Sequence, residues 1–411
     1  METTMENTDF EIIELANGFR CVFRRSTGVA YCGIVTGAGS RDEPEGQQGL
    51  AHFVEHTLFK GTRRRRSWHI SSRMESVGGE LNAYTTKEET MVYTVAPRGY
   101  LHRAVELLAD VVCDSIFPAA ELEREREVVI DEINSYLDSP ADAVYDEFED
   151  LLYAGSALGH NILGRPESVR SLSGEDCRAF IKAHYTPRNM VIYCVADSSV
   201  RQLRAMLERH FGHLDFPTQD SGRQTPVINP TFHTVHDHSR HQAHTLMGCR
   251  LFSRHDQRRF ALFLLNNYLG GPCMNSLLNR ELREKRGLVY AVDSSVALMS
   301  DCGAIQIYFG CDREHIGKCS HIVTHAIEDL AAKPMKPQLF ERIRRQYLGQ
   351  IEVASSHAES RAMALGKSML YYGRVLGVAD TIAEIRRLEP AALTEVASLI
   401  AERQFSTLTL M

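Results

Sequence analysis

The segment GLAHFVEHTLFKG, residues 49–61, carries the pattern around which the rest of the chain is interpreted. Within it, His52, Glu55 and His56 have the spacing H-x-x-E-H. Residues three and four apart lie on one face of an α-helix, so the two imidazoles and the carboxylate would project into one small volume. The remaining positions are mostly apolar: Leu50, Ala51, Phe53, Val54, Leu58 and Phe59. We therefore predict a buried helix that presents two imidazoles and a carboxylate together.

These residue types suit metal-assisted hydrolysis. Two neutral imidazoles favour zinc, a third protein ligand is normally needed, and a catalytic site leaves the fourth position to water. Glu55 directly precedes His56, where it can take a proton from that water rather than bind the ion. The motif inverts the H-E-x-x-H order and is a zinc-peptidase signature. The alternative is a surface helix with ordinary His and Glu; burial disfavours it, because buried polar side chains need partners.

Composition places the chain among ordinary soluble globular proteins. It has 411 residues, a length that is enough for two or more domains. Of these residues, 44% are hydrophobic and 24% are charged, which is ordinary for such proteins. The net charge of −7 gives no support to nucleic-acid binding. The arginine run at residues 63–66 is expected to be a solvated loop or helix start, and a phosphate or acidic-substrate patch is the alternative.

Cysteine usage, the amino terminus and hydropathy together predict where in the cell the protein is found. None of the ten cysteines forms a C-x-x-C pair and several lie in apolar runs, so they are expected to be buried thiols in a reducing environment. The amino terminus, METTMENTDF, resembles neither a secretory signal nor a transit peptide. No run of 18 apolar residues could span a bilayer. We expect a cytoplasmic protein that does not bind membranes.

The pattern along the chain predicts an α+β fold with two domains. Two short strands flank Asn17-Gly18, and residues 80–86 and 90–96 form a second strand pair close in sequence to the motif helix. Residues 215–230, DFPTQDSGRQTPVINP, contain three prolines and are typical of a linker. We predict a zinc-binding catalytic domain at 1–215, a linker at 216–230 and a homologous domain at 231–411.

The second half repeats the plan of the first. A strand near residues 243–250 precedes an apolar helix at 259–269, which contains neither His nor Glu. We expect two similar domains related by duplication, each a mostly antiparallel sheet packed with helices. A His-rich stretch lies between the linker and this repeat. We expect surface strands there, and a second metal site is the alternative. The histidines of this stretch are His233, His236, His238, His241 and His244.

A second informative stretch is AAELEREREVVIDEINSYL, residues 119–137. Most of its charges fit a solvated helix with alternating signs. Glu125 and Glu132 are seven residues apart and therefore share a face, near apolar Val128, Val129 and Ile133. A carboxylate on that face could complete a His-His-Glu zinc site. Sequence distance alone does not show that this helix meets the first one.

At this point the chain resembles the pitrilysin-like zinc metallopeptidases, which include insulin-degrading enzyme and mitochondrial processing peptidase. The matching segments occur in the family's order: GAGSRDEPEGQQGLAHFVEHTLFKGT, GGELNAYTTKEETMVY, EREREVVIDE, ALGHNILG and YTPRNM. The resemblance implies that His52, His56 and Glu132 bind one Zn²⁺ ion per chain. It also implies that Glu55 is the general base and that Glu125 supports the site.

The resemblance further implies how a substrate binds. Peptides in the family add a strand to a sheet edge near the zinc, and Asn82 and Ala83 match the positions that contact the substrate backbone. A turn followed by a purely structural strand is the alternative. In the second half, Arg283 and Tyr290 have the spacing of an Arg/Tyr pair that reaches the substrate. Arg283 could instead be an ordinary solvated helix charge.

Together these features predict a zinc metalloendopeptidase that hydrolyses peptides or unfolded segments. Longer relatives carry four such domains around a chamber, so the resemblance implies that two chains of this length pair, most simply as a homodimer. Two alternatives remain. The chain could be one subunit of a heteromeric processing peptidase, or a non-catalytic subunit like the core proteins of respiratory complexes.

Overall fold

The computed structural model describes residues 10–214, 222–237 and 241–411. By its internal contacts the chain divides into two compact units. Unit 1 comprises Met1–Ile133, Asn161–Arg223 and Ser355–Leu376. Unit 2 comprises Asn134–His160, Gln224–Ala354 and Gly377–Met411. Each unit therefore contains a segment from the other half of the sequence.

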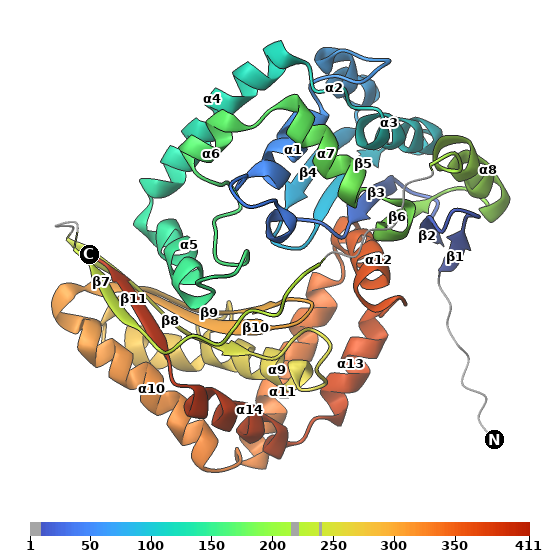
Figure 1. Cartoon of the computed structure of the whole chain (residues 1–411). Coiled ribbons are helices and arrows are strands. Elements are labelled where there is room, and N and C mark those ends of the chain that lie inside the picture. The colour runs from blue at the N-terminus through green and yellow to red at the C-terminus, as the bar shows by residue number, and fades with distance from the viewer. Residues whose placement is uncertain (1–9, 215–221, 238–240) are drawn as a thin grey trace, which may run out of the picture. The chain divides into compact units, whose positions relative to one another are not determined.

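Unit 1 is built on a six-stranded sheet with the order β1-β2-β6-β3-β5-β4 (Figure 1). β2 and β6 are parallel and the other neighbours are antiparallel. The hairpin between β1 and β2 turns at Gly18, whose φ of 85° is readily adopted only by glycine. The strands are Glu11–Glu14 (β1), Arg20–Arg25 (β2), Ala30–Thr36 (β3), Glu80–Thr85 (β4), Thr90–Ala96 (β5) and Met190–Ala196 (β6).

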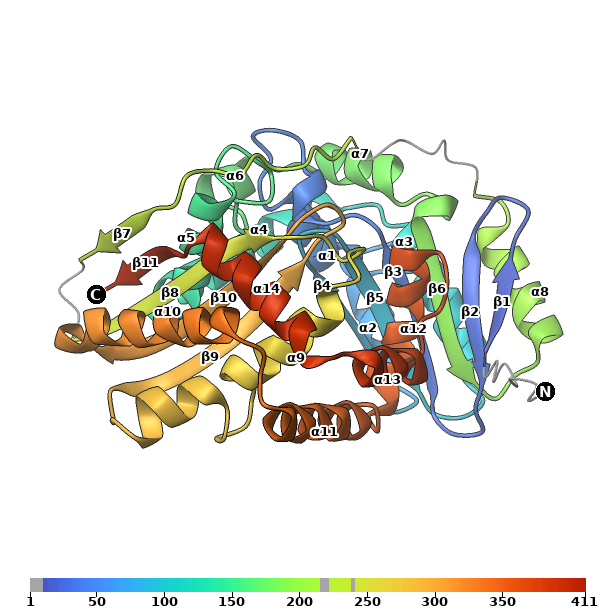
Figure 2. The ribbon, with the colours of Figure 1, turned by 90° about the horizontal axis from the view of Figure 1, so that it is seen from below.

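Helices cover both faces of this sheet. Alternate residues of β3 show the division: Cys32 and Ile34 belong to the larger core on one side, and Val35 belongs to a smaller core on the other. The larger core includes residues of Leu50–Leu58 (α1), Ser67–Glu75 (α2), Leu101–Cys113 (α3), Ala119–Leu137 (α4), Pro166–Ser171 (α6), Gly174–His184 (α7) and Val200–Phe211 (α8). On the smaller side lies Ala358–Tyr372 (α12), which packs against β3 and β6 (Figure 2).

Unit 2 contains a five-stranded sheet with the order β7-β11-β8-β10-β9. β7 and β11 are parallel and the remaining pairs are antiparallel. The strands are His233–His236 (β7), Gln242–Leu251 (β8), Val289–Leu298 (β9), Gly303–Asp312 (β10) and Ser406–Leu410 (β11).

The unit 2 sheet is also covered on both faces (Figure 1). One face packs against α5, Pro140–Leu152, through Val144 and Phe148. The other face and its outer layer carry Arg259–Gly270 (α9), Ile316–Ala332 (α10), Pro337–Ala354 (α11), Val378–Arg387 (α13) and Pro390–Arg403 (α14). A short π-helix, Asn279–Glu284, precedes β9.

The two sheets share one topology. Taken in chain order, β2 to β6 and β7 to β11 are arranged identically, with one parallel pair followed by antiparallel pairs. α9 follows β8 as α1 follows β3. The predicted α+β class, with two similar domains of mostly antiparallel sheet packed with helices, is therefore confirmed. Unit 1 differs by the additional edge strand β1.

The predicted linker is only partly described. Residues 215–221 lie outside the described residues, and residues 222–230 form no helix or strand. Arg223 is anchored in unit 1 through a bidentate contact with Asp42, with Nε and Nη2 each 2.7 Å from a carboxylate oxygen. The predicted domain boundaries in sequence stay a prediction.

Within the described part of the chain, no helix has the length and apolar character needed to cross a membrane.

Candidate metal centre

The motif segment forms α1, and its start is fixed by two features. Gly49 has a φ of 91°, and a Cβ there would lie 2.5 Å from the Leu163 carbonyl oxygen, so this position requires glycine. The carboxylate of Glu43 accepts hydrogen bonds from the backbone N–H groups of Gly49, at 3.0 Å, and Ala51, at 2.8 Å. A carboxylate at a helix start satisfies otherwise unpaired donors and opposes the helix dipole.

Three potential ligand atoms converge between α1 and α4. His52 Nε2 is 3.8 Å and His56 Nε2 is 3.6 Å from Glu132 Oε2. The ligand atoms of these three residues all lie within 4.8 Å of one another. Among the described residues, no other group of three or more His, Cys, Asp or Glu is arranged to hold an ion. The predicted meeting of the two helices is thus present in the structure.

Glu125 contacts His56 from outside the group of three potential ligands. Its Oε1 is 2.9 Å from His56 Nδ1, and its Oε2 is 2.6 Å from Lys60 Nζ. Because an ionised carboxylate only accepts, His56 carries a proton on Nδ1, and its Nε2 atom faces Glu132. Burial would raise the pKa of Glu125, but hydrogen bonds from His56 and Lys60 hold it below its usual value. Lys60 is a site residue that sequence reasoning missed.

The two histidines differ in their electrostatics. Burial, followed by the proximity of His56, lowers the pKa of His52 to about 3, so its ring is neutral at physiological pH. Burial also acts to lower the pKa of His56, but the Glu125 hydrogen bond and nearby carboxylates raise it above its ordinary value. A proton and a cation therefore compete for this carboxylate-rich site.

Glu55 is buried beside the histidines. Burial raises its pKa, while a hydrogen bond with Thr85 and the proximity of His56 partly oppose that shift. A carboxylate with a raised pKa is a better proton acceptor at neutral pH than an ordinary glutamate.

The donor set fits zinc. Tetrahedral ligands about 2.0–2.1 Å from the ion lie roughly 3.4 Å apart, and the two nitrogen-to-oxygen separations here are only slightly wider, at 3.6 and 3.8 Å. Glu132 retains 34% side-chain exposure, which leaves an approach open for water or substrate. One feature is less typical: the buried Nδ1 of His52 has no hydrogen-bond partner, so packing alone orients that ring.

The predicted peptide-binding residues Asn82 and Ala83 lie on β4. This strand is the edge of its sheet, with β5 on one side only, and it packs beside α1. Asn82 is exposed and Ala83 is half-buried. An extended peptide could therefore pair with β4 near the three ligands.

The predicted Arg283 and Tyr290 both belong to unit 2. Together with Asn266, Gly271 and Asp293 they line a cavity of about 550 Å³ at the start of β9. Tyr290 is 53% exposed, and its hydroxyl donates to Asp312 Oδ1 at 2.5 Å. Arg283 belongs to the π-helix, a rare element that often marks functional positions.

The His-rich stretch and the arginine run form ordinary polar contacts in the structure. In the His-rich stretch, His236 pairs with Glu147 and His244 with Tyr308, each at 2.8 Å, and His238 lies outside the described residues. The arginine run is partly structural, because Arg65 pairs with Glu106 and with buried Asp110. All ten cysteines are free, as expected.

Two family models and several known proteins match this chain. Residues 22–165 match the profile of "Insulinase (Peptidase family M16)" and residues 171–347 match "Peptidase M16 inactive domain". An uncharacterized zinc protease of Streptomyces coelicolor is 32% identical over 95% of this chain and 87% of its own length. The mitochondrial-processing peptidase subunit beta of Bos taurus is 28% identical over 93% and 80%.

A solved structure from Pseudomonas fluorescens, described as a peptidase M16 inactive domain, shares the fold. It superimposes with a TM-score of 0.90 over 98% of both chains, at 19% sequence identity.

Proposed function

The chain belongs to peptidase family M16, the insulinase family, and on that basis we propose that it is a zinc-dependent metalloendopeptidase acting on peptides or unfolded segments. The observation that carries the proposal is the convergence of His52, His56 and Glu132 beside a buried Glu55. A fold retained without its chemistry would not require these four residues together.

In this proposal each residue of the candidate metal centre has one task. His52, His56 and Glu132 hold the ion, and Glu125 with Lys60 keeps the His56 ring in the tautomer that offers Nε2. A bound zinc ion would act as a Lewis acid and lower the pKa of a coordinated water to about 7. Glu55 accepts a proton from the attacking water and delivers it to the leaving amine.

Substrate binding would use the free edge of β4. A peptide added as a strand donates and accepts main-chain hydrogen bonds, which makes recognition largely independent of side chains. Asn82 and Ala83 would lie along that backbone. Arg283 and Tyr290 would contact the same peptide, with Arg283 binding its carbonyls and Tyr290 donating to the developing oxyanion.

We place the protein in the cytoplasm as a homodimer. Its ten free cysteines fit a reducing compartment. The homodimer follows from one chain that contains both the metal ligands and the Arg/Tyr pair, so two copies would provide a complete chamber. Similarity to the beta subunit of a processing peptidase supports a second candidate, in which this chain works with a different partner.

The test is cleavage of a quenched fluorescent peptide library by the purified chain, with and without a chelator, alongside its mass in solution. Chelator-sensitive cleavage is expected, and readdition of zinc should restore it. Zinc binding without cleavage would instead favour the heteromeric subunit. Absence of both zinc and cleavage would favour a non-catalytic scaffold.

A further inference from the structure

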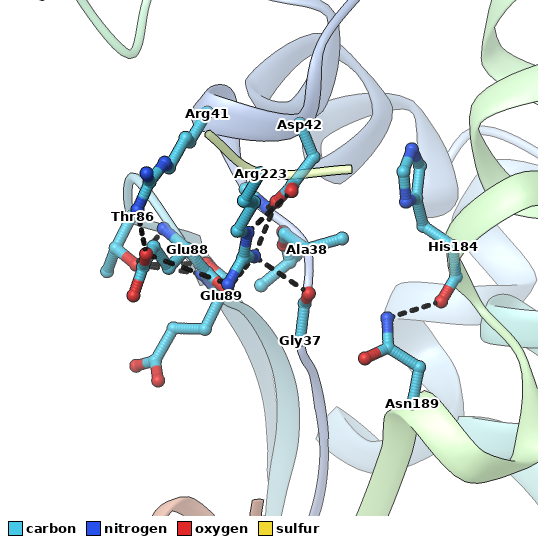
Figure 3. A network of polar contacts seen from close by, with 12 residues as sticks. Gly37, Ala38, Arg41, Asp42, Thr86, Glu88, Glu89, His184, Asn189 and Arg223 are labelled. Carbon is cyan, nitrogen blue, oxygen red and sulfur yellow. Dashed lines mark hydrogen bonds and ion pairs between the residues drawn. The ribbon is translucent and has the colours of Figure 1, made fainter. Parts of the chain in front are cut away.

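Arg223 lies in the predicted linker, yet its side chain is only 16% exposed. Its Nε and Nη2 atoms each lie 2.7 Å from an oxygen of the Asp42 carboxylate, which is fully buried. Nη2 also donates to the carbonyl oxygens of Gly37 and Glu88, at 3.0 and 3.2 Å. Figure 3 shows this guanidinium between the segment that leads to α1 and the turn that joins β4 to β5. One side chain thus contacts two segments that are distant from it in sequence.

We propose that Arg223 is a positioning residue for the candidate metal centre. Its guanidinium holds the loop before α1 against the turn after β4, and it thereby fixes the metal helix relative to the strand edge proposed to bind substrate. The inference rests on the proposed function, because it assigns Arg223 a role in the same reaction. Arg223 acts through these two segments and touches neither the ion nor the peptide.

The contact with Asp42 leads directly to the start of α1. The Asp42 carboxylate also accepts a hydrogen bond from the backbone N–H of Gly39, at 2.9 Å, so it fixes the backbone of its own loop. The next residue, Glu43, accepts hydrogen bonds from the backbone N–H groups of Gly49 and Ala51. Because Asp42 and Glu43 are adjacent, a displacement of Asp42 would move the carboxylate that caps the metal helix.

The same loop is in backbone contact with the turn after β4. The N–H group of Ser40 donates to the Thr86 carbonyl oxygen at 3.1 Å. The N–H group of Arg41 donates to the Lys87 carbonyl oxygen at 2.8 Å. A Cβ at Gly39 would lie 2.1 Å from the Thr86 carbonyl oxygen, so the two segments are as close as backbones allow. A shift of the loop would therefore be transmitted to the end of β4.

Burial makes the loop sensitive to the loss of this guanidinium. Arg41 Nη1 is 2.6 Å from Glu88 Oε1, and both side chains are almost fully buried, so the junction of loop and turn is charged and dry. A buried carboxylate that loses its bidentate partner is strongly destabilised. Without Arg223, the loop should move until water reaches Asp42. A lysine cannot replace the planar fork of donors, because it provides a single point charge.

The first test compares Arg223→Met with Arg201→Met, which changes an exposed arginine at the start of α8. In Arg223→Met, zinc affinity and kcat/KM should each fall about 10- to 100-fold, because displaced supports of a metal site have effects of this size. Arg201→Met should match wild type. A folded Arg223→Met protein that is less stable but keeps wild-type zinc affinity and kcat/KM would overturn the proposal, since the role would then be purely structural.

A double-mutant cycle tests the contact with Asp42. Asp42→Asn keeps the shape of the side chain and removes its charge, so it should also lower zinc affinity. In that background Arg223→Met should cause a much smaller further loss, and strictly additive losses would overturn the proposed coupling. Arg223→Lys should show a smaller loss in the same direction, and it replaces Arg223→Met if the methionine variant does not fold.

Amide hydrogen exchange separates this inference from the proposed function. In metal-free protein, residues 49–53 and 86–90 should exchange at least about tenfold faster in Arg223→Met than in wild type, because both segments lose a shared support. Such acceleration would support the positioning role even if the wild-type chain cleaved no peptide, a result that would refute the proposed function alone. Wild-type exchange rates in both segments would overturn the inference.

Discussion

His52 and Glu55 lie three residues apart on one helix, and burial shifts their pKa values in opposite directions. For His52, burial lowers the pKa to about 3 and so keeps the ring neutral, as a metal ligand must be. For Glu55, burial raises the pKa, as a general base requires. A single buried helix thus favours the protonation states that the proposed ligand and the proposed base require, because desolvation always disfavours the charged form.

Glu55→Gln should retain zinc and lose turnover. The amide keeps the size of the side chain but cannot accept a proton from water, so kcat should fall by at least about 100-fold. Metal content by elemental analysis and kcat on one fluorescent peptide provide the measurement. An active Glu55→Gln protein would refute the role assigned to Glu55.

Glu132→Ala should release the metal, because two imidazoles alone bind zinc weakly compared with a three-ligand set. Glu127→Ala is the matched control, since Glu127 is an exposed glutamate on the same helix. We expect the zinc content after dialysis to fall strongly in the first variant and to stay at the wild-type level in the second. Unchanged zinc in Glu132→Ala would show that another residue supplies the third ligand.

The neutral state of His52 predicts a pH dependence of stability in the metal-free protein. In the unfolded chain this ring is protonated below about pH 6.5, whereas in the folded protein its pKa is about 3. The unfolded state therefore binds more protons as the pH falls through this window, and stability decreases. Between about pH 7 and pH 4.5 the contribution is roughly 2.5 kcal/mol.

Urea unfolding of wild type and His52→Asn at both pH values measures this contribution. The wild-type protein should lose roughly 2.5 kcal/mol more than the variant on acidification. His56, whose pKa is raised, is present in both proteins, so most of its own contribution cancels in the comparison. Equal losses would contradict the assigned neutral state.

At the scale of elements, the loop before α1 anchors the amino-terminal end of that helix. Glu43 satisfies backbone donors at the start of α1. The buried ion pair between Arg41 and Glu88, with backbone hydrogen bonds from Ser40 and Arg41, attaches the preceding loop to the β4–β5 turn. The loop before α1 therefore connects the metal helix to the strand proposed to bind substrate. Small displacements of such a support can lower catalysis substantially.

Glu43→Ala should destabilise the start of α1 by about 1–2 kcal/mol, since two backbone N–H groups lose their acceptor. Zinc affinity should fall as well, because the ligands depend on that helix. Glu45→Ala, an exposed glutamate in the same loop, is the control. Thermal unfolding and a competitive zinc titration measure both effects, and identical behaviour of the two variants would argue against the cap.

At the scale of the whole molecule, one sheet topology occurs twice, and among the described residues only the first copy carries the candidate ligand set. α9 occupies the position of α1 after the second strand but contains neither His nor Glu in RFALFLLNNYLG. Each sheet also has one face covered by a helix from the other half of the sequence: α12 in unit 1 and α5 in unit 2. Neither unit corresponds to a single continuous segment that could be excised intact.

The proposed homodimer predicts a mass in solution of about twice the 46.3 kDa chain. Sedimentation across a dilution series should show peptidase activity decreasing together with the dimer fraction, because a single chain would then form only half of the proposed chamber. A monomer with full activity would contradict the homodimer and leave the peptidase assignment intact.

The sequence by itself determined the local chemistry of the motif helix. The spacing of His52, Glu55 and His56 decides which side chains share a helical face, and this depends only on helix periodicity and on the apolar residues around them. The alternating strands and their turns were predictable for the same reason. The family resemblance suggested that Glu125 and Glu132 belong to the site, whereas periodicity could place them on one face but could not bring them to α1.

Only the tertiary structure decided what surrounds those residues. The approach of Glu132 to His52 and His56, the contact of Lys60 with Glu125, and the coverage of each sheet by α5 or α12 all join segments distant in sequence or on different elements. No local pattern encodes such pairings, because they result from packing the whole chain into shared cores. Burial then follows from packing, and the pKa values that prepare His52 and Glu55 follow from burial.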